Sequence, residues 1–197
     1  MNMDQQIDRA VAVLRQGGVV AYPNDTVYSL GVAISRESAV RRVYEIKGRD
    51  CHRPLLIAVA DFEMLVRYCR VTGEELNALR QIWPGAISVL LPKLDGVTSA
   101  VTAGRPLVGV RMPNYPPLRE LIKKLGEPIT TTSANLSGQP DSIEAEEINL
   151  PVDLVIRGSC QWKKPSTLVD LKRRQILRRG AEVERAERWL RSLSKSI

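Results

Sequence analysis

The spacing of apolar residues along the chain predicts alternating helices and strands. Apolar positions recur every three or four residues, as in helices with one buried face, at residues 4–16, 38–46, 61–68, 72–82, 118–125 and 181–193. Short β-branched runs predict strands at residues 19–22, 55–59, 87–91, 108–112, 153–157, 166–171 and 175–178, and strand character also begins at Thr130. We expect residues 87–91 at the centre of a sheet, Leu177 facing inward, a loop over residues 97–105 and one or two exposed helical turns over residues 141–147.

This alternation indicates an α/β (α+β) fold. It lacks the regular strand–helix–strand repeat of a doubly wound sheet, and no repeat or low-complexity linker divides the chain, so residues 1–197 are expected to form a single domain. The phosphate-binding motifs G-x-x-x-x-G-K-[ST] and G-x-G-x-x-G are both absent. A bound nucleotide would therefore need hydroxyl-rich strand ends and nearby cations.

The composition narrows the classes of function. Cys51, Cys69 and Cys160 form no Cys-x-x-Cys pair, so the sequence indicates neither a disulfide framework nor a zinc site. His52 is the only histidine and no G-x-S-x-G is present, which disfavours a His-based metal site and a Ser-His-Asp mechanism. No apolar run approaches the roughly 20 residues of a membrane span, and residues 1–10 do not resemble a signal peptide. We expect a cytoplasmic protein without a membrane partner.

The net charge of +7 is concentrated near the C-terminus. Residues 157–197 contain 12 Lys and Arg against 4 Asp and Glu, a surplus of +8 that leaves −1 for the rest of the chain. This surplus indicates a basic face for nucleic acid, or equally a solvated helix and hairpin. Because aromatic residues make up only 5% of the chain, contact with the backbone of a folded RNA is favoured over base stacking.

Three polar segments carry the candidate chemistry. The first, T-T-T-S-A-N-L-S-G at residues 130–138, is either a ligand-binding strand end or a polar strand end with a capping residue. The second, Lys47-Gly48-Arg49, offers two cations to a phosphate chain or simply complements a helix dipole. The third is Arg111, which ends a buried strand and needs either a ligand carboxylate or an internal acid.

These segments resemble the YrdC-like family of threonylcarbamoyl-AMP synthases. The resemblance covers residues 7–181 and rests on seven short motifs in the family's order: Y-P-N-D-T-V-Y-S-L-G from Tyr22, K-G-R from Lys47, W-P-G from Trp83, V-R-M-P from Val110, S-A-N-L-S-G from Ser133, P-S-T-L-V-D from Pro165 and I-L-R-R-G-A from Ile176. It implies a twisted mixed sheet flanked by helices around a large concave basic cavity. This is a YrdC-like fold, also described as double-stranded-RNA-binding-like.

The resemblance also implies an activity. Family enzymes convert L-threonine, bicarbonate and ATP into threonylcarbamoyl-adenylate and pyrophosphate, the intermediate for t6A at position 37 of tRNA. The implied partners are these substrates, tRNA or another double-stranded RNA, and the tRNA threonylcarbamoyl-transferase machinery. Mg²⁺ is expected with the ATP phosphates, without a protein side chain as ligand and without an organic cofactor.

Residue roles follow from the same resemblance. Lys47, Arg49, Ser133 and Asn135 are implied as the catalytic, phosphate-handling set, with Arg178 also near the nucleotide. The implied threonine pocket consists of Asn24, Thr26, Arg111, Thr131 and Ser166. Thr131, Ser133 and Asn135 are two residues apart, so on a strand all three would face one cavity.

The sequence departs from the family pattern at four positions. Asn24 replaces Thr, Ser29 replaces Gly, Asp50 replaces Pro, and Ala58 replaces a His of longer members. Two alternatives remain open at this point. One is a non-catalytic RNA-binding protein of the same fold in rRNA or ribosome maturation, and the other is a carbamoyl-phosphate-converting accessory domain.

Overall fold

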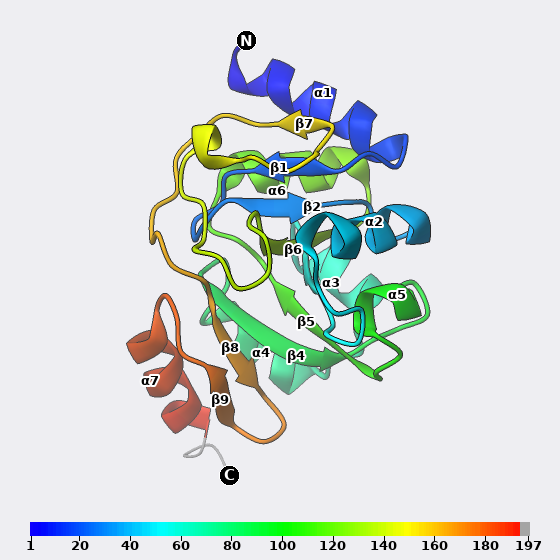
Figure 1. Ribbon diagram of the computed structural model, residues 1–197. Coiled ribbons are helices and arrows are strands. Elements are labelled where there is room, and N and C mark those ends of the chain that lie inside the picture. The colour runs from blue at the N-terminus through cyan, green and yellow to red at the C-terminus, as the bar shows by residue number, and fades with distance from the viewer. Residues whose placement is uncertain (194–197) are drawn as a thin grey trace.

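A nine-stranded mixed sheet forms the centre of the protein. The computed structural model describes residues 1–193 of the chain (Figure 1). The strand order is β7-β1-β2-β6-β3-β5-β4-β8-β9. The strands are β1 (Val20–Tyr22), β2 (Ser29–Gly31), β3 (Leu56–Ala58), β4 (Ile87–Pro92), β5 (Leu107–Arg111), β6 (Ile129–Ser133), β7 (Leu154–Val155), β8 (Thr167–Asp170) and β9 (Gln175–Arg178).

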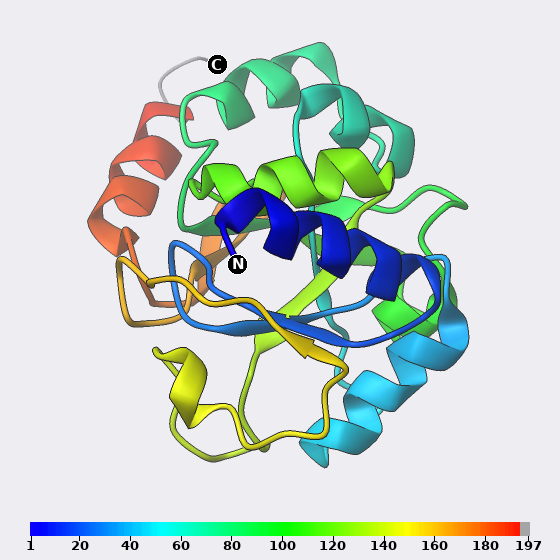
Figure 2. The ribbon, with the colours of Figure 1, turned by 90° about the horizontal axis from the view of Figure 1, so that it is seen from above.

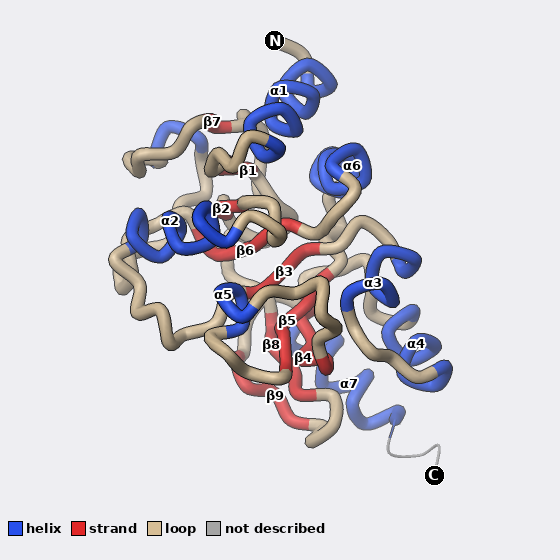
Figure 3. Tube along the Cα trace, turned by 90° about the vertical axis from the view of Figure 1, so that its right-hand side faces the viewer, coloured by secondary structure: helices blue, strands red, loops and turns tan. Residues whose placement is uncertain are grey.

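Helices cover both faces of this sheet. They are α1 (Met3–Arg15), α2 (Glu37–Lys47), α3 (Phe62–Tyr68), α4 (Gly73–Arg80), α5 (Ser99–Thr102), α6 (Pro116–Leu125) and α7 (Val183–Leu193), with one 3₁₀ turn at Ala145–Glu147. Figure 3 shows α1, α6, α3 and α4 on one side of the strands and α2 with α5 on the other. Seen from above, α1 and α6 lie side by side, where Lys124 Nζ and Asp8 Oδ1 are 2.7 Å apart (Figure 2).

Local sequence signals fix the ends of several helices. Asn2 caps α1 in a reciprocal pair of hydrogen bonds with Gln5, and Thr72 does the same for α4 with Glu75. Gly48 ends α2 with a left-handed φ of 56°, a conformation that costs glycine little. Because Gly48 turns the chain immediately after Lys47, the two cations of the Lys47-Gly48-Arg49 motif leave the helix in different directions.

The predicted fold class is confirmed, with corrections to individual elements. The strand predicted at the centre of the sheet, β4, is seventh in the strand order, and β3 is central. Leu177 is 45% exposed, so the prediction that it faces inward is wrong; its neighbour Ile176 packs against the core instead. The segment predicted as a loop over residues 97–105 contains the short helix α5.

The position of β9 at one edge of the sheet explains the error at Leu177. Only one neighbour, β8, pairs with β9, and the pairing shifts register between Leu168 and Val169. This irregularity decides which alternate residue faces the core, and a sequence pattern of four residues does not reveal it.

Among the described residues, no helix has the length and hydrophobicity to cross a membrane.

Candidate functional site

A solvent-open cavity of about 130 Å³ lies where several strands end. Its lining comes from six separate parts of the chain: Thr26, Val27 and Ser29; Arg49 and Pro54 to Leu56; Arg111; Thr131 to Ser133; Pro165 and Ser166; and Arg178. Three of these side chains are arginines, and among the described residues no Asp or Glu lies in the lining. The volume is below the roughly 300–1,000 Å³ of pockets for drug-sized ligands, so a nucleotide would extend out through the mouth.

Strand pairing brings these distant segments together. Ser133 on β6 lies opposite Ser29 on β2, and Thr131 lies opposite Leu56 on β3. Antiparallel β6 therefore places its hydroxyl-bearing side chains between the turn that follows β1 and the loop that follows α2. The first part of the T-T-T-S-A-N-L-S-G segment, Thr131 to Ser133, is therefore a wall of the cavity.

Lys47 is buried at the C-terminal end of α2, with only 3% of its surface exposed. Its Nζ donates to the backbone carbonyl of Ser133, to Asn135 O at 2.7 Å and to Asn135 Oδ1 at 3.3 Å. Burial, with a contribution from the Arg49 charge, lowers the pKa of Lys47 to about 8. Lys47 is therefore a buried cation in the last turn of α2, held beside the end of β6.

Ser133 and Asn135 form a connected polar group with this lysine. Ser133 Oγ donates to Asn135 Oδ1 at 2.6 Å, and the Asn135 amide donates to the carbonyl of Gln139. Because β6 ends at Ser133, the two-residue strand period does not extend to Asn135. Ser133 lines the cavity, while Asn135 and Lys47 lie behind it.

Two arginines from distant parts of the chain line the cavity, Arg49 on the loop after α2 and Arg178 at the end of β9. Arg49 Nε donates to Arg53 O at 3.2 Å and its Nη2 to Pro54 O at 3.1 Å. Arg178 Nη2 donates to Ser166 Oγ at 3.0 Å. Desolvation lowers the pKa of both guanidinium groups, and each is lowered further by another arginine, Arg53 for Arg49 and Arg111 for Arg178. The arrangement concentrates positive charge that an anionic ligand would relieve.

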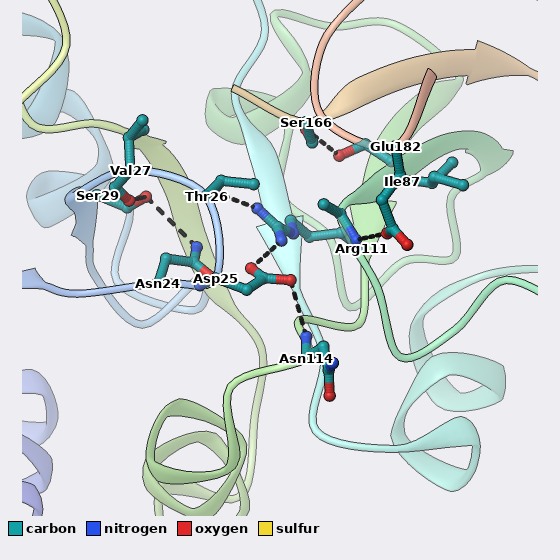
Figure 4. Close-up of polar contacts among 12 residues, drawn as sticks. Asn24, Asp25, Thr26, Val27, Ser29, Ile87, Arg111, Asn114, Ser166 and Glu182 are labelled. Carbon is teal, nitrogen blue, oxygen red and sulfur yellow. Dashed lines mark hydrogen bonds and ion pairs between the residues drawn. The ribbon is translucent and has the colours of Figure 1, made fainter. Parts of the chain in front are cut away.

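Arg111 has an internal partner that the sequence analysis left as an alternative. It forms a buried ion pair with Asp25, and its Nη1 donates to Thr26 Oγ1 at 2.9 Å (Figure 4). The second oxygen of Asp25 accepts from the backbone N–H of Asn114 at 2.9 Å. The Arg111 Nε has no hydrogen-bond partner among the described residues. Asp25 was missed because nothing in the sequence distinguishes a buried acid in a Pro-Asn-Asp turn from an exposed one.

The other residues assigned to the threonine pocket do not all line the cavity. Thr26, Thr131 and Ser166 do, and Ser166 Oγ lies 2.8 Å from the buried hydroxyl of Ser88. Asn24 is fully buried outside the lining, where its amide lies 3.5 Å from Ser29 Oγ (Figure 4). Of the ten residues assigned to phosphates or threonine, seven line the cavity, and two, Lys47 and Asn135, lie beside it in contact with Ser133. Asn24 lies in the supporting turn instead.

Acidic side chains pair with several cations of the basic C-terminal segment, two of these acids lying within the segment and one before it. Arg179 lies 2.8 Å from Glu187, Arg185 lies 2.7 Å from Glu182, and Arg157 pairs with Glu146. Exposed pairs of this kind contribute little stability, but they reduce the positive field available to a polyanion. The charge surplus alone therefore carries no RNA-binding site.

Gly180 controls how closely the end of β9 approaches Ser166. A Cβ at this position would lie 2.2 Å from Pro165 O and 2.7 Å from Ser166 O. We expect Gly180→Ala to displace the Ser166–Arg178 contact and to lower the free energy of unfolding by about 1–3 kcal/mol, measured by urea denaturation. Gly73→Ala is the matched control, because no atom lies within 4 Å of its added Cβ. Equal stability of the two variants would contradict the packing argument.

Comparisons with known proteins identify the family of the chain and its fold. A family model named Sua5/YciO/YrdC, described as "Telomere recombination", matches residues 12–180. Two curated relatives are named threonylcarbamoyl-AMP synthase: a Bacillus subtilis protein, 41% identical over 79% of this chain and 45% of its own, and a Vibrio vulnificus (strain YJ016) protein, 32% identical over 90% of this chain and 100% of its own. The crystal structure of P. abyssi Sua5 complexed with L-threonine has a TM-score of 0.86 and 33% identity, over 94% of this chain and 58% of that one. The chain spans about half the length of the Bacillus relative.

Proposed function

The chain belongs to the Sua5/YciO/YrdC family, and on this basis we propose that it is an L-threonylcarbamoyladenylate synthase, a nucleotidyltransferase. The reaction joins L-threonine, bicarbonate and ATP into threonylcarbamoyl-AMP, with release of pyrophosphate and water. The observation that carries the proposal is the arginine-lined cavity beside the Lys47–Ser133–Asn135 group. The names of the relatives favour this activity over the RNA-binding alternative.

In this proposal the cations of the site bind the phosphates of ATP. Attack on the α-phosphorus places negative charge on the transferring phosphoryl group and on the leaving pyrophosphate. Arg49 and Arg178, at two sides of the cavity, would bind these oxygens, and the Ser133 hydroxyl would donate to one of them. All three N–H groups of Lys47 are used by Ser133 and Asn135, so Lys47 would exchange its longest contact, that with Asn135 Oδ1, for a phosphate oxygen. Catalysis of this kind works by position and electrostatics and needs no protein nucleophile.

The deeper part of the cavity would hold threonine. The unpaired Nε of Arg111 is a buried donor that the amino-acid carboxylate would satisfy. Hydroxyls of Thr26, Thr131 and Ser166 would meet the amino acid's polar groups. Asn24 would act indirectly, since its carbonyl accepts from the backbone N–H of Asp25 at 2.9 Å and so helps to shape the turn. Because Asp25 already pairs with Arg111, the carboxylate of threonine would bind an arginine whose charge is partly balanced by the protein.

Mg²⁺ would enter as part of the Mg–ATP substrate. Within residues 1–193 no carboxylate lines the cavity, and both oxygens of Asp25 are engaged by Arg111 and by the N–H of Asn114. This donor set does not suit a dedicated magnesium site of protein oxygens, but it suits a triphosphate that carries its own ion. We further propose that the product passes to the tRNA threonylcarbamoyl-transferase machinery, in a cytoplasmic pathway.

The test is threonine-dependent release of pyrophosphate from ATP. Purified protein with Mg²⁺ and bicarbonate should release pyrophosphate only when L-threonine is added, with threonylcarbamoyl-AMP detected by mass spectrometry. Omission of bicarbonate is the control, because hydrolysis of ATP by a contaminant would not need it. No threonine-dependent release under these conditions would exclude the proposed activity.

The lowered pKa of Lys47 predicts a pH dependence. Between pH 7 and 9 the free protein loses the Lys47 proton, so the dissociation constant for ATP should rise roughly tenfold if binding needs the charged amine. The pKa of Lys47 is about 8 in the folded chain and 10.5 ordinarily, so between pH 7 and 9 the folded chain binds fewer protons than the unfolded chain. The contribution of Lys47 to the free energy of unfolding therefore rises with pH over this range. Calorimetric titrations of ATP at pH 7, 8 and 9 measure the first effect. Lys47→Arg should flatten the profile, and an unchanged profile in that variant would assign the titration to another group.

A further inference from the structure

Three metal-ligating side chains meet on the loop between α2 and β3, outside the cavity lining. Asp50, Cys51 and His52 are consecutive, and one ligand atom from each lies within 4.8 Å of the other two. Asp50 Oδ1 is 2.9 Å from His52 Nδ1, and Cys51 Sγ is 3.8 Å from the same nitrogen. All three residues are exposed, so a hydrated ion can reach them.

The identity and spacing of these donors suit zinc. Carboxylate oxygen, thiolate sulfur and imidazole nitrogen are the protein ligands of Zn²⁺, at about 2.0–2.3 Å. In a tetrahedron with such bonds, oxygen and nitrogen lie about 3.4 Å apart, and sulfur and nitrogen lie about 3.6 Å apart. The two separations that involve His52 Nδ1 differ from these values by about half an ångström or less, and the ligand atoms of Asp50 and Cys51 lie within 4.8 Å of each other, so rotations of these exposed side chains would admit the ion. Thiolate and imidazole select against Mg²⁺ and Ca²⁺.

The backbone of the loop already holds the donors near one another. The N–H of His52 donates to Asp50 Oδ1 at 2.9 Å, and the N–H of Arg53 donates to Asp50 O at 3.0 Å. A preformed turn reduces the conformational entropy that ion binding must overcome.

We propose that Asp50, Cys51 and His52 form a three-ligand site for a divalent ion of borderline softness, with zinc as the natural candidate and water completing the coordination. The same turn supplies the Arg53 carbonyl that accepts from Arg49 Nε. Zinc bound there would fix the turn and thereby the position of Arg49 at the cavity. This regulatory consequence rests on the proposed function, whereas the metal site itself does not.

A cobalt titration tests the site without any substrate. The full chain, reduced and freed of metal with a chelator, is titrated with Co²⁺ while absorption is recorded. We expect a thiolate-to-cobalt charge-transfer band that saturates at one ion per chain and disappears when Zn²⁺ displaces the cobalt. Cys69 and Cys160 are buried, so the band reports on Cys51.

Variants make the result specific. Cys51→Ser should abolish the band, and His52→Gln and Asp50→Asn should each weaken Co²⁺ binding at least about tenfold. Asp95→Asn, which alters another exposed carboxylate, is the matched control and should bind Co²⁺ as the unmodified chain does. Absence of the band in the unmodified chain, or its persistence in Cys51→Ser, would overturn the proposal. Either result would leave threonine-dependent pyrophosphate release unaffected, so the two proposals are tested separately.

Discussion

Lys47→Ala is expected to reduce threonine-dependent pyrophosphate release by about 10²- to 10³-fold, the usual loss when one preorganised donor to developing charge is removed. The lysine is the cation fixed closest to Ser133 and Asn135, through two backbone carbonyls and one side-chain oxygen. Its removal takes away a charge and also releases the polar group that it organises. Steady-state assays of pyrophosphate release, with ATP and threonine varied separately, measure the effect.

The structure changes what else this variant should do. A solvent-exposed lysine could be truncated at little cost, but Lys47 is buried and donates to the partly buried carbonyls of Ser133 and Asn135. Each buried acceptor left unpaired costs about 1–3 kcal/mol, so Lys47→Ala should also unfold at lower urea concentration. Lys123→Ala, an exposed lysine in the last turn of α6, is the matched control for loss of charge. Retained activity in a folded Lys47→Ala protein would remove Lys47 from the phosphate-binding set.

Much of the fold was predictable because its local signals are strong. The apolar stripe of α1, with Ile7, Ala10 and Leu14 buried, has the helical period, although the helix begins at Met3 and its cap is Asn2 and not the expected Asp4. The position of β4 in the sheet was not predictable in the same way. Strand order is set by pairings between residues far apart in sequence, such as Val89 with both Val110 and Val169. Hydrophobicity identified β4 as buried but did not reveal which strands lie beside it.

In the candidate site too, some features were predictable from the sequence and others were not. Residue types and motif order selected Lys47, Ser133 and Asn135, and the fold brings these three into direct hydrogen-bonded contact. The sequence did not reveal which groups are already satisfied by the protein itself. Arg111 was assigned to a ligand carboxylate, yet the structure gives it Asp25, because a turn after β1 brings that acid beneath the end of β5. Contacts of this kind depend on tertiary packing that a single sequence does not display.

Asp25→Ala is expected to lower the free energy of unfolding by about 3–5 kcal/mol, the cost of removing one partner from a buried ion pair. Arg111 and Asp25 are almost completely inaccessible to solvent, so water does not replace the lost carboxylate. The backbone N–H of Asn114 would lose its acceptor as well. Asp95→Ala removes an exposed carboxylate instead and should change stability by less than about 0.5 kcal/mol.

A double-mutant cycle separates the ion pair from other effects of truncation. Arg111→Met removes the charge that Asp25 balances, so the combined variant should be less destabilised than the sum of the two single variants, by about 1–3 kcal/mol in urea denaturation. Additive losses would mean that the two side chains do not stabilise each other. The cycle also bears on substrate binding, since L-threonine offers a carboxylate to the same guanidinium. If Arg111 binds that carboxylate, added threonine should raise the stability of Asp25→Ala through mass action and leave Arg111→Met unchanged. No stabilisation of Asp25→Ala by threonine would confine Arg111 to its structural pair.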